Sequence, residues 1–381
     1  MTRPDLSRRA LLLSAAGALA CGRHKATAFR GFCFVANQVG RSVAVVDLTR
    51  FRLRREIPLD AAPAAVVAHP SQAKVFVLAP DTGTVYEIDA LTLAVSRRAR
   101  AGNQAAGMQV GPENKVLWVL YRDPPALVEL PLDSLRPARR IRLAAPPDSF
   151  DLSRENQAAI ASRQAQTIVL ASLANTTVAR TFNAGAEPSL LRYRWDGVQL
   201  LVGSRSERVL TIFDVASGKP VVRLPLPVSP RQFCFNADGG QLFISGDGMD
   251  AVAIVYPYRT EVAETMLAGR APDGMAATES PPYLLVTNPE TNSVTALAFD
   301  NMGRKLVAVV QVGEEPRHIV ITPDRQYALV LNQKSGDLAV IRIWSLAQAP
   351  NGALRRFKTA PLFTLVPVGE KPVSAAVVAF G

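Results

Sequence analysis

A unit of about 42 residues recurs along this chain of 381 residues and constrains its fold more than any other feature. Each unit opens with a turn that usually contains proline, continues through three short apolar strands, and ends in a more polar fourth strand. The opening turn recurs at Pro63, Ala105, Pro147, Pro188, Pro230, Pro272, Pro316 and Pro372. The last interval is longer because residues 349–359 form an insertion. Such regular spacing predicts a repeat architecture.

One unit shows what each repeat builds. Strands are predicted over 64–68, 74–78, 84–89 and 92–98, and they are separated by the turn-forming stretches 70–72 and 80–83. Short valine-rich strands with almost no helical periodicity indicate an all-β fold. A four-stranded antiparallel sheet of this size cannot bury both faces alone, whereas radial stacking covers each face with a neighbour. We therefore predict a β-propeller made of four-stranded antiparallel blades.

The two ends of the repeat region predict how the ring closes. Residues 371–380 read as a first strand with nothing after it, and residues 29–36 read as a second strand with no first strand before it. Together they would make one composite blade, in which the C-terminal strand joins the N-terminal blade. A single propeller domain over 29–381 would then have eight blades. Seven is the alternative, if the unit near Pro147 does not form its own sheet.

The amino terminus has the pattern of an export signal. Arg8 and Arg9 precede an apolar stretch, 11–20, that is too short for a permanent membrane span but suits a signal peptide. The arginine pair resembles the twin-arginine export motif. Cys21 follows Ala18-Leu19-Ala20, which resembles a bacterial lipobox. We expect a signal peptide over 1–20, lipidation of Cys21 and a linker over 21–28. An ordinary secretory peptide with an incidental cysteine is the alternative.

These signals predict where the protein resides and which partners it lacks. We expect an exported lipoprotein, periplasmic or anchored to the outer membrane, that contacts the membrane only through its lipid. A hydrophobic content of 48% excludes a disordered chain. The net charge of +11 comes mostly from scattered arginines without a dense basic run, so nucleic acid is not the expected partner.

Cysteine and histidine usage gives no sign of a metal site or a cofactor. Cys33 and Cys234 each lie between two phenylalanines, as small buried strand residues do, and we expect them to lie too far apart for a disulfide. Neither has CxxC spacing. The histidines are His24 in the linker, His69 at a strand end, where a structural role is favoured, and His318 near the channel mouth. We therefore expect no metal and no cofactor.

The units resemble the YVTN-type β-propeller repeat. Matching stretches are Phe34-Val35-Ala36-Asn37, Val43 to Asp47, and Val286-Thr287-Asn288. The closest match runs from Val312-Gly313-Glu314-Glu315-Pro316 to Leu331-Asn332. The stretch from Pro316-Arg317-His318 to Val368-Gly369 also looks like the last blade of the bacterial 6-phosphogluconolactonase-like propellers. This resemblance implies a propeller fold and suggests lactone hydrolysis as an activity.

The resemblance departs from that family at the residues that would perform the chemistry. Members thought to be catalytic carry a Pro-Arg-His turn followed by Asn-Glu in a central blade. The central turns here are Pro188-Ser189-Leu190 and Pro230-Arg231-Gln232, which contain no histidine. After His318 the pair is Asn332-Gln333, so the carboxylate is absent. A lactonase would have to use His318 as its base and Arg317 to polarise the carbonyl.

Propeller geometry predicts a cluster of arginines around the central opening. Turns that enter first strands and turns that leave second strands lie on one face of a propeller. The expected ligand-binding residues on this face are Arg122, Asp148, Arg163, Arg205, Arg231, Asp273, Arg317, His318 and Asn332, with Asp247 and Asn288 beside them. The arginines would either attract carboxylates, phosphates or an acidic partner, or form ion pairs with Asp148, Asp247 and Asp273.

Three classes of function follow from these observations. The leading hypothesis is a monomeric, non-catalytic binding propeller of the cell envelope that takes an anionic small molecule or an envelope protein at the funnel. The alternative is the lactonase-type hydrolase. An electron-transfer propeller is the third, but the chain lacks the cysteine pair that attaches a c-type haem.

Overall fold

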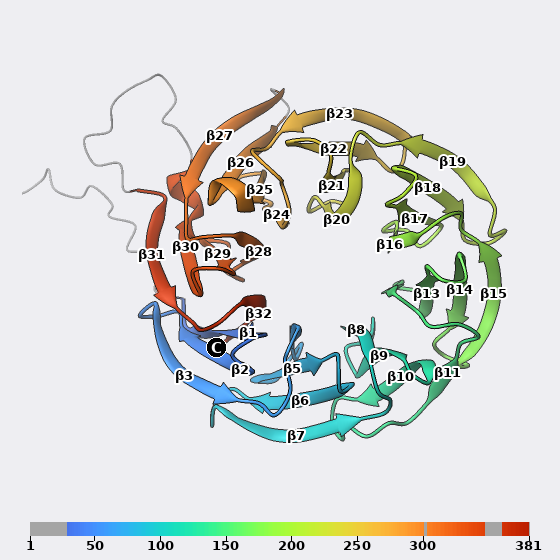
Figure 1. Cartoon of the computed structure of the whole chain (residues 1–381), viewed down its shortest axis with the longest axis horizontal. Helices are drawn as coiled ribbons and strands as arrows, with labels where there is room; N and C mark the ends of the chain where they lie inside the picture. Colours follow the sequence, from blue (N-terminus) through green and yellow to red (C-terminus); the bar gives the residue numbers. More distant parts are fainter. Residues whose placement is uncertain (1–28, 301–302, 347–359, 381) are drawn as a thin grey trace, which may run out of the picture.

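The computed structural model describes residues 29–300, 303–346 and 360–380. These residues form eight antiparallel sheets of four strands each, arranged as blades around a central opening (Figure 1). The predicted signal peptide, Cys21, the linker over 21–28 and the insertion over 349–359 lie outside the described residues. The part of the chain that is described contains no helix long and apolar enough to cross a membrane.

The first four blades follow the chain from its N-terminal strand. Blade 1 contains β1 (Gly31–Asn37), β2 (Ser42–Asp47), β3 (Arg52–Pro58) and β32 (Pro372–Ala379). Blade 2 contains β4 (Ala65–Ala68), β5 (Lys74–Ala79), β6 (Thr84–Asp89) and β7 (Ala94–Arg100). Blade 3 contains β8 (Ala105–Val110), β9 (Val116–Arg122), β10 (Pro125–Pro131) and β11 (Arg140–Arg142). Blade 4 contains β12 (Ser149–Leu152), β13 (Gln157–Ser162), β14 (Thr167–Ser172) and β15 (Thr177–Asn183).

The other four blades complete the ring and include two short 3-10 helices. Blade 5 contains β16 (Pro188–Tyr193), β17 (Gln199–Ser204), β18 (Val209–Asp214) and β19 (Pro220–Pro225). Blade 6 contains β20 (Ser229–Phe235), β21 (Leu242–Asp247), β22 (Ala251–Tyr256) and β23 (Glu261–Leu267). Blade 7 contains β24 (Met275–Ala277), β25 (Tyr283–Asn288), η1 (Pro289–Thr291), β26 (Ser293–Asp300) and β27 (Gly303–Gln311). Blade 8 contains β28 (Pro316–Ile321), β29 (Tyr327–Asn332), β30 (Asp337–Arg342), η2 (Ile343–Ser345) and β31 (Leu362–Pro367).

This architecture confirms the predicted eight-bladed propeller over the seven-bladed alternative. The unit near Pro147 forms its own sheet, β12 to β15. The predicted strands of the second unit agree with β4 to β7 to within about two residues at each end, which is the usual uncertainty of strand boundaries.

Closure of the ring also follows the prediction. The C-terminal strand β32 pairs with β1 in antiparallel register, with Phe34 opposite Ala376, so the innermost strand of blade 1 comes from the far end of the chain. Beside the first residues of β1, the rings of Phe32 and Phe380 pack edge to face, with their centres 4.8 Å apart. Hydrogen bonds between the two chain ends therefore fasten the ring.

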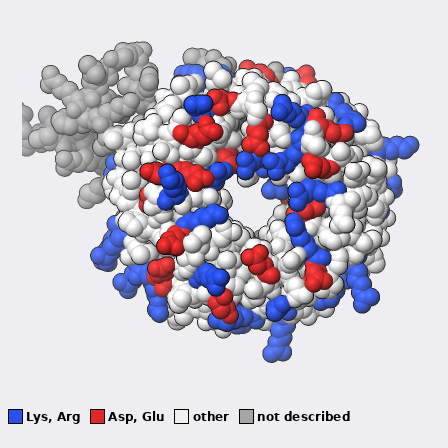
Figure 2. All heavy atoms as spheres, viewed as in Figure 1, with Lys and Arg blue, Asp and Glu red and all other residues white. Residues whose placement is uncertain are grey.

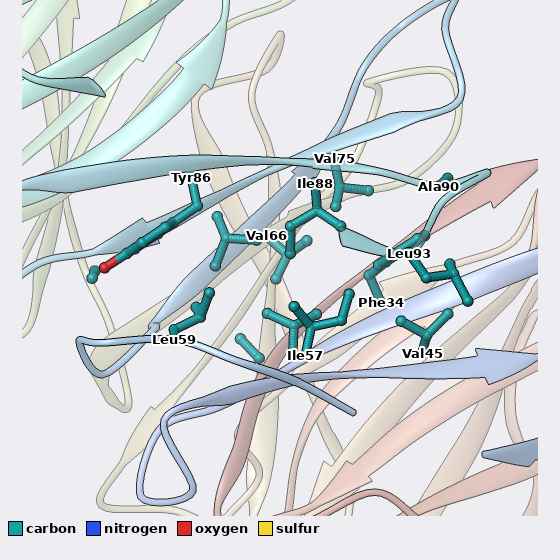
Figure 3. Close-up of a cluster of buried hydrophobic side chains, with 14 of the residues drawn as sticks. Phe34, Val45, Ile57, Leu59, Val66, Val75, Tyr86, Ile88, Ala90 and Leu93 are labelled. Carbon is teal, nitrogen blue, oxygen red and sulfur yellow. The ribbon is translucent and has the colours of Figure 1, made fainter. Parts of the chain in front are cut away.

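The core consists of apolar layers between neighbouring blades. Because successive side chains of a strand point to opposite faces, β1 contributes to two such layers. Phe34 packs with Val75 of blade 2, in the cluster shown in Figure 3, while Val35 packs with Leu331 of blade 8. Each blade thus buries both faces, as the repeat predicted.

Unpaired cysteines confirm the expectation about disulfides. Cys33 lies in blade 1 and Cys234 in blade 6, with two blades between them along the shorter way round the ring, and both are free thiols. Burial raises the pKa of Cys33 to about 12 and that of Cys234 to about 11. Both are therefore neutral packing residues at physiological pH.

In the repeat, the asparagine that ends a second strand packs against a glycine that precedes an entering turn, as Asn332 does against Gly313. Asn37, Asn288 and Asn332, each at the end of a second strand, are fully buried. The Nδ2 of Asn332 donates to Asp337 at 2.6 Å, across the hairpin that follows it. A Cβ on Gly313 would lie 2.6 Å from that Nδ2, so only glycine lets the entering turn cover the amide.

This packing predicts that Gly313→Ala destabilises the propeller by about 1–3 kcal/mol, since the added methyl group has no room. Denaturant unfolding followed by circular dichroism would measure the change. Gly107→Ala is the matched control, because a Cβ there meets its nearest neighbour at an ordinary 3.6 Å. Equal stability of the two variants would contradict the packing role of Gly313.

Candidate functional site

Two faces of the ring are defined by the direction of the strands. The turns that enter each innermost strand lie beside the turns that join the second strand to the third, as the pairing of Pro372 with Asn37 shows in blade 1. We call this side the funnel face. The opposite side, where the first strand turns into the second and the third into the fourth, is the base face.

The first group of predicted arginines surrounds Asp148 on the funnel face. Its carboxylate accepts from Arg122 of blade 3 at 3.1 Å and from Arg163 of its own blade 4 at 2.8 Å. The backbone amide of Arg163 donates to the other carboxylate oxygen at 2.8 Å. An open cavity of about 390 Å³ lies beside this group, and Glu187 also lines it.

Electrostatics at Asp148 favour the charged carboxylate. Partial burial by itself would raise the pKa of Asp148, but the hydrogen bonds from Arg163 and the charges of Arg163 and Arg122 together outweigh it. The pKa therefore lies below its ordinary value, and the group is a fixed ion-pair network at neutral pH.

Two further groups repeat this arrangement around the ring. Asp247 of blade 6 accepts from Arg205 of blade 5 at 3.2 Å and from Arg231 of its own blade at 3.1 Å. Asp273 of blade 7 accepts from Arg317 of blade 8 at 2.8 Å. Arg317 also donates to Glu315 through Nε at 2.9 Å and Nη2 at 2.7 Å.

These contacts show the ion pairs that were foreseen as one of the two roles of the arginines. All five predicted arginines pair with Asp148, Asp247 or Asp273, as the ion-pair explanation required. In each group one pair joins neighbouring blades, so the network also ties blade to blade on the funnel face.

A cavity of about 620 Å³ at the channel mouth brings several basic side chains together. In Figure 2, basic side chains border the central opening, with acidic side chains between them. Four of the lining residues are basic and one is acidic. The lining residues are Gln38, Arg231, Glu315, Arg317, Gln333, Lys334, Lys371 and Val373.

Sequence reasoning predicted Arg231 and Arg317 here but missed the two lysines. Lys371 directly precedes the entering Pro372 of the composite blade, and Lys334 lies in the turn after Asn332. The predicted closure could have identified Lys371, because the C-terminal strand of blade 1 must begin with an entering turn, as the first strand of every other blade does. Gln38, which follows the second-strand residue Asn37, lies at the matching exit.

Two of the predicted site residues have polar side-chain atoms that are shielded from solvent. Asn332 lies at the predicted end of β29 on the funnel face, but its side chain is fully buried and bonds within its blade. His318 is partly exposed, but its Nε2 is shielded from solvent and has no hydrogen-bond partner in the described structure. Burial lowers the pKa of His318, although a hydrogen bond with the Ala375 backbone and the charge of Asp273 oppose this.

His69, for which a structural role was expected, caps a turn. Its Nδ1 accepts from the backbone amides of Ser71 and Gln72, each at 3.1 Å.

Comparisons with known proteins agree with the propeller fold. The family model described as a lactonase with a seven-bladed β-propeller matches residues 270–361, which include Asp273, Arg317 and His318. Over this stretch, about a quarter of its length, the chain is distantly similar to the lactonase propellers. It differs from that description in having eight blades. A comparison with curated protein sequences finds no match.

The following three solved structures show the fold alone, since each is below 25% identity to this chain. The dihydro-heme d1 dehydrogenase NirN, solved in complex with DHE, is 18% identical with a TM-score of 0.74, over 93% of this chain and 76% of that one. Hydrazine synthase of Kuenenia stuttgartiensis is 18% identical with a TM-score of 0.56, over 81% and 91%. A functionally unknown protein of Desulfotomaculum acetoxidans is 11% identical with a TM-score of 0.60, over 92% and 99%.

The ion pairs of Asp148 predict a pH-dependent contribution to stability. Because its folded pKa is depressed, this contribution is present above the ordinary value of about 4 and is lost as pH falls through the folded value. Asp148→Asn should therefore be less stable than the wild type by about 0.5–1 kcal/mol at pH 7. The difference should shrink between about pH 4 and pH 2, as thermal unfolding would show; a constant difference would contradict the ion-pair role.

Proposed function

We propose that this protein is an exported, lipid-anchored binding propeller of the cell envelope that binds a small anionic ligand at the mouth of its channel. The observation that carries the proposal is the 620 Å³ cavity, whose lining holds Arg231, Arg317, Lys334 and Lys371 against the single carboxylate of Glu315. A concentration of positive charge at a recessed opening raises the local concentration of anions.

Two of these cations are arranged for binding. Asp247 fixes Arg231 through Nη1 alone, so its Nε and Nη2 keep their donors for a ligand. Lys371 lines the cavity and forms no ion pair with any carboxylate of the described residues, so its ammonium group is available to a ligand. Arg317 and Lys334 are already paired with Glu315 and Glu314, and they contribute mainly to the local potential.

The ligand class follows from the spread of these donors. Arg231 belongs to blade 6 and Lys371 to the entering turn of blade 1, so we propose a ligand with at least two acidic groups, one for each cation. Guanidinium and ammonium groups both bind carboxylates and phosphates well. Citrate and haemin are therefore suitable probes, and haemin is included because one structural neighbour is a dihydro-heme d1 dehydrogenase.

Substitution of the two available cations tests this proposal. Arg231→Gln and Lys371→Gln should each weaken citrate binding about tenfold or more, because each removes a charge-assisted hydrogen bond. Isothermal titration calorimetry at low ionic strength would measure the affinity, which should also fall as salt is added.

Arg205→Gln is the matched control, since Arg205 pairs with the same Asp247 but does not line the cavity. Its citrate affinity should stay within about twofold of the wild type, because the contact it loses lies outside the cavity. Equal effects of all three substitutions, or no binding by the wild type, would contradict the proposed site.

The family match over residues 270–361 supports a second candidate, lactone hydrolysis by His318 and Arg317. A neutral imidazole with a free Nε2 has the form that a general base needs. That atom is shielded from solvent, however, and Asn332-Gln333 supplies no carboxylate to orient it.

We therefore expect the purified protein to show no turnover of aliphatic lactones, measured by proton release at constant pH. Turnover that disappears in His318→Gln and persists in His69→Gln would instead establish the enzyme. His69 is the control because it caps a turn on the base face.

A further inference from the structure

The base face carries the strongly exposed aromatic side chains of the described structure. Among these residues, the four aromatic side chains that are between 39% and 52% exposed are Trp195, Tyr258, Trp344 and Phe363. Trp195 lies in the turn from β16 to β17, Tyr258 in the turn from β22 to β23, Trp344 in η2 after β30, and Phe363 at the start of β31. Each of these places is at or next to a base-face turn.

An arginine lies over most of these rings. The guanidinium of Arg154 lies 5.0 Å from the centre of the Trp195 ring, and that of Arg194 lies 4.5 Å from the Tyr258 ring. The third pair is formed by Arg342 and Phe363, at 3.8 Å. Such pairs combine an apolar ring with a cation, which suits the boundary between lipid headgroups and acyl chains.

The chain also enters the propeller on this face. β1 begins at Gly31 on the base side and runs to Asn37 on the funnel side, and the Thr49 hydroxyl donates to the Phe29 carbonyl at 3.2 Å beside this entry. A linker over 21–28 reaches at most about 28 Å when fully extended. The height of β1 alone is about 23 Å. A lipid at Cys21 can therefore hold the base face against a bilayer easily, whereas reaching the bilayer from the funnel side would use nearly its whole length.

We propose that the base face docks on the surface of a phospholipid bilayer, with the aromatic rings in the headgroup region and Arg154 and Arg342 at the phosphates, whereas Arg194 is held by Asp196. The proposal rests on the lipid anchor at Cys21 put forward above. This orientation turns the funnel face, and with it the channel mouth, away from the membrane and toward ligands in solution.

Quenching by brominated lipids tests this orientation. The lipidated full-length chain would be placed in vesicles of phosphatidylethanolamine and phosphatidylglycerol whose acyl chains are brominated near the glycerol. The emission of Trp195 and Trp344 should fall relative to unbrominated vesicles, and Trp195→Phe/Trp344→Phe should remove the effect. Trp118, which is 1% exposed in the core of blade 3, remains as the background signal.

Met249→Trp, added to the double phenylalanine variant, is the matched control. Met249 is 39% exposed in the turn from β21 to β22 on the funnel face, so a tryptophan there should keep its emission. Quenching at position 249 equal to that of Trp195 and Trp344 would overturn the proposed orientation. A soluble quencher tests a different occupant in the absence of vesicles. If Trp195 and Trp344 become better protected from it as the protein concentration rises, a second copy of the chain covers the base face, and the proposal is overturned.

The outcome also separates docking from anchoring. Suppose that the wild type is incorporated into vesicles, that Cys21→Ser is not, and that Trp195 and Trp344 remain unquenched. This result would support the lipid anchor and overturn the docking of the base face. If the chain does not enter vesicles at all, the anchor fails and docking falls with it. Citrate affinity at the channel mouth is measured separately and is independent of both results.

Discussion

Apolar packing between neighbouring blades is the interaction on which the rest of the structure depends. Each blade has two apolar faces, and the alternation of side chains along strands such as β1 sends Phe34 to one neighbour and Val35 to the other. A row of such blades would leave one face bare at each end. The ring therefore has to close, and the pairing of β32 with β1 closes it through backbone hydrogen bonds.

Charged side chains on the funnel face mainly join neighbouring blades of the ring, and only some of them are available to bind a ligand. Asp148, Asp247 and Asp273 each accept from an arginine of an adjacent blade, so the ion pairs join edges that the apolar layers have already brought together. What remains for binding is the surplus of positive charge at the channel mouth, where Arg231 and Lys371 line the same cavity. The proposed site is thus the part of the funnel that the structural pairing does not neutralise.

The sequence predicted the fold better than it predicted the site, for a physical reason. Repeat spacing and turn chemistry are local, and they suffice to favour eight blades and to place Arg231 and Arg317 on one face. The sequence did not show that the Asn332 side chain is buried, because the same position can turn outward or close its own hairpin, and its contacts with Asp337 and Gly313 decide this. Lys371 was missed because its neighbours at the mouth, Arg231 and Gln38, are distant in the chain.

By itself, the sequence determined the all-β repeat, the closure by the C-terminal strand and the separation of the two cysteines, and it favoured eight blades over seven. These follow from periodicity and from the need of every blade to cover both faces. Only the tertiary structure decided which arginines are paired, which lysines join them at the channel mouth, and that the exposed aromatic rings share the face where the chain enters. Such features depend on contacts between blades, which the order of residues within one blade does not specify.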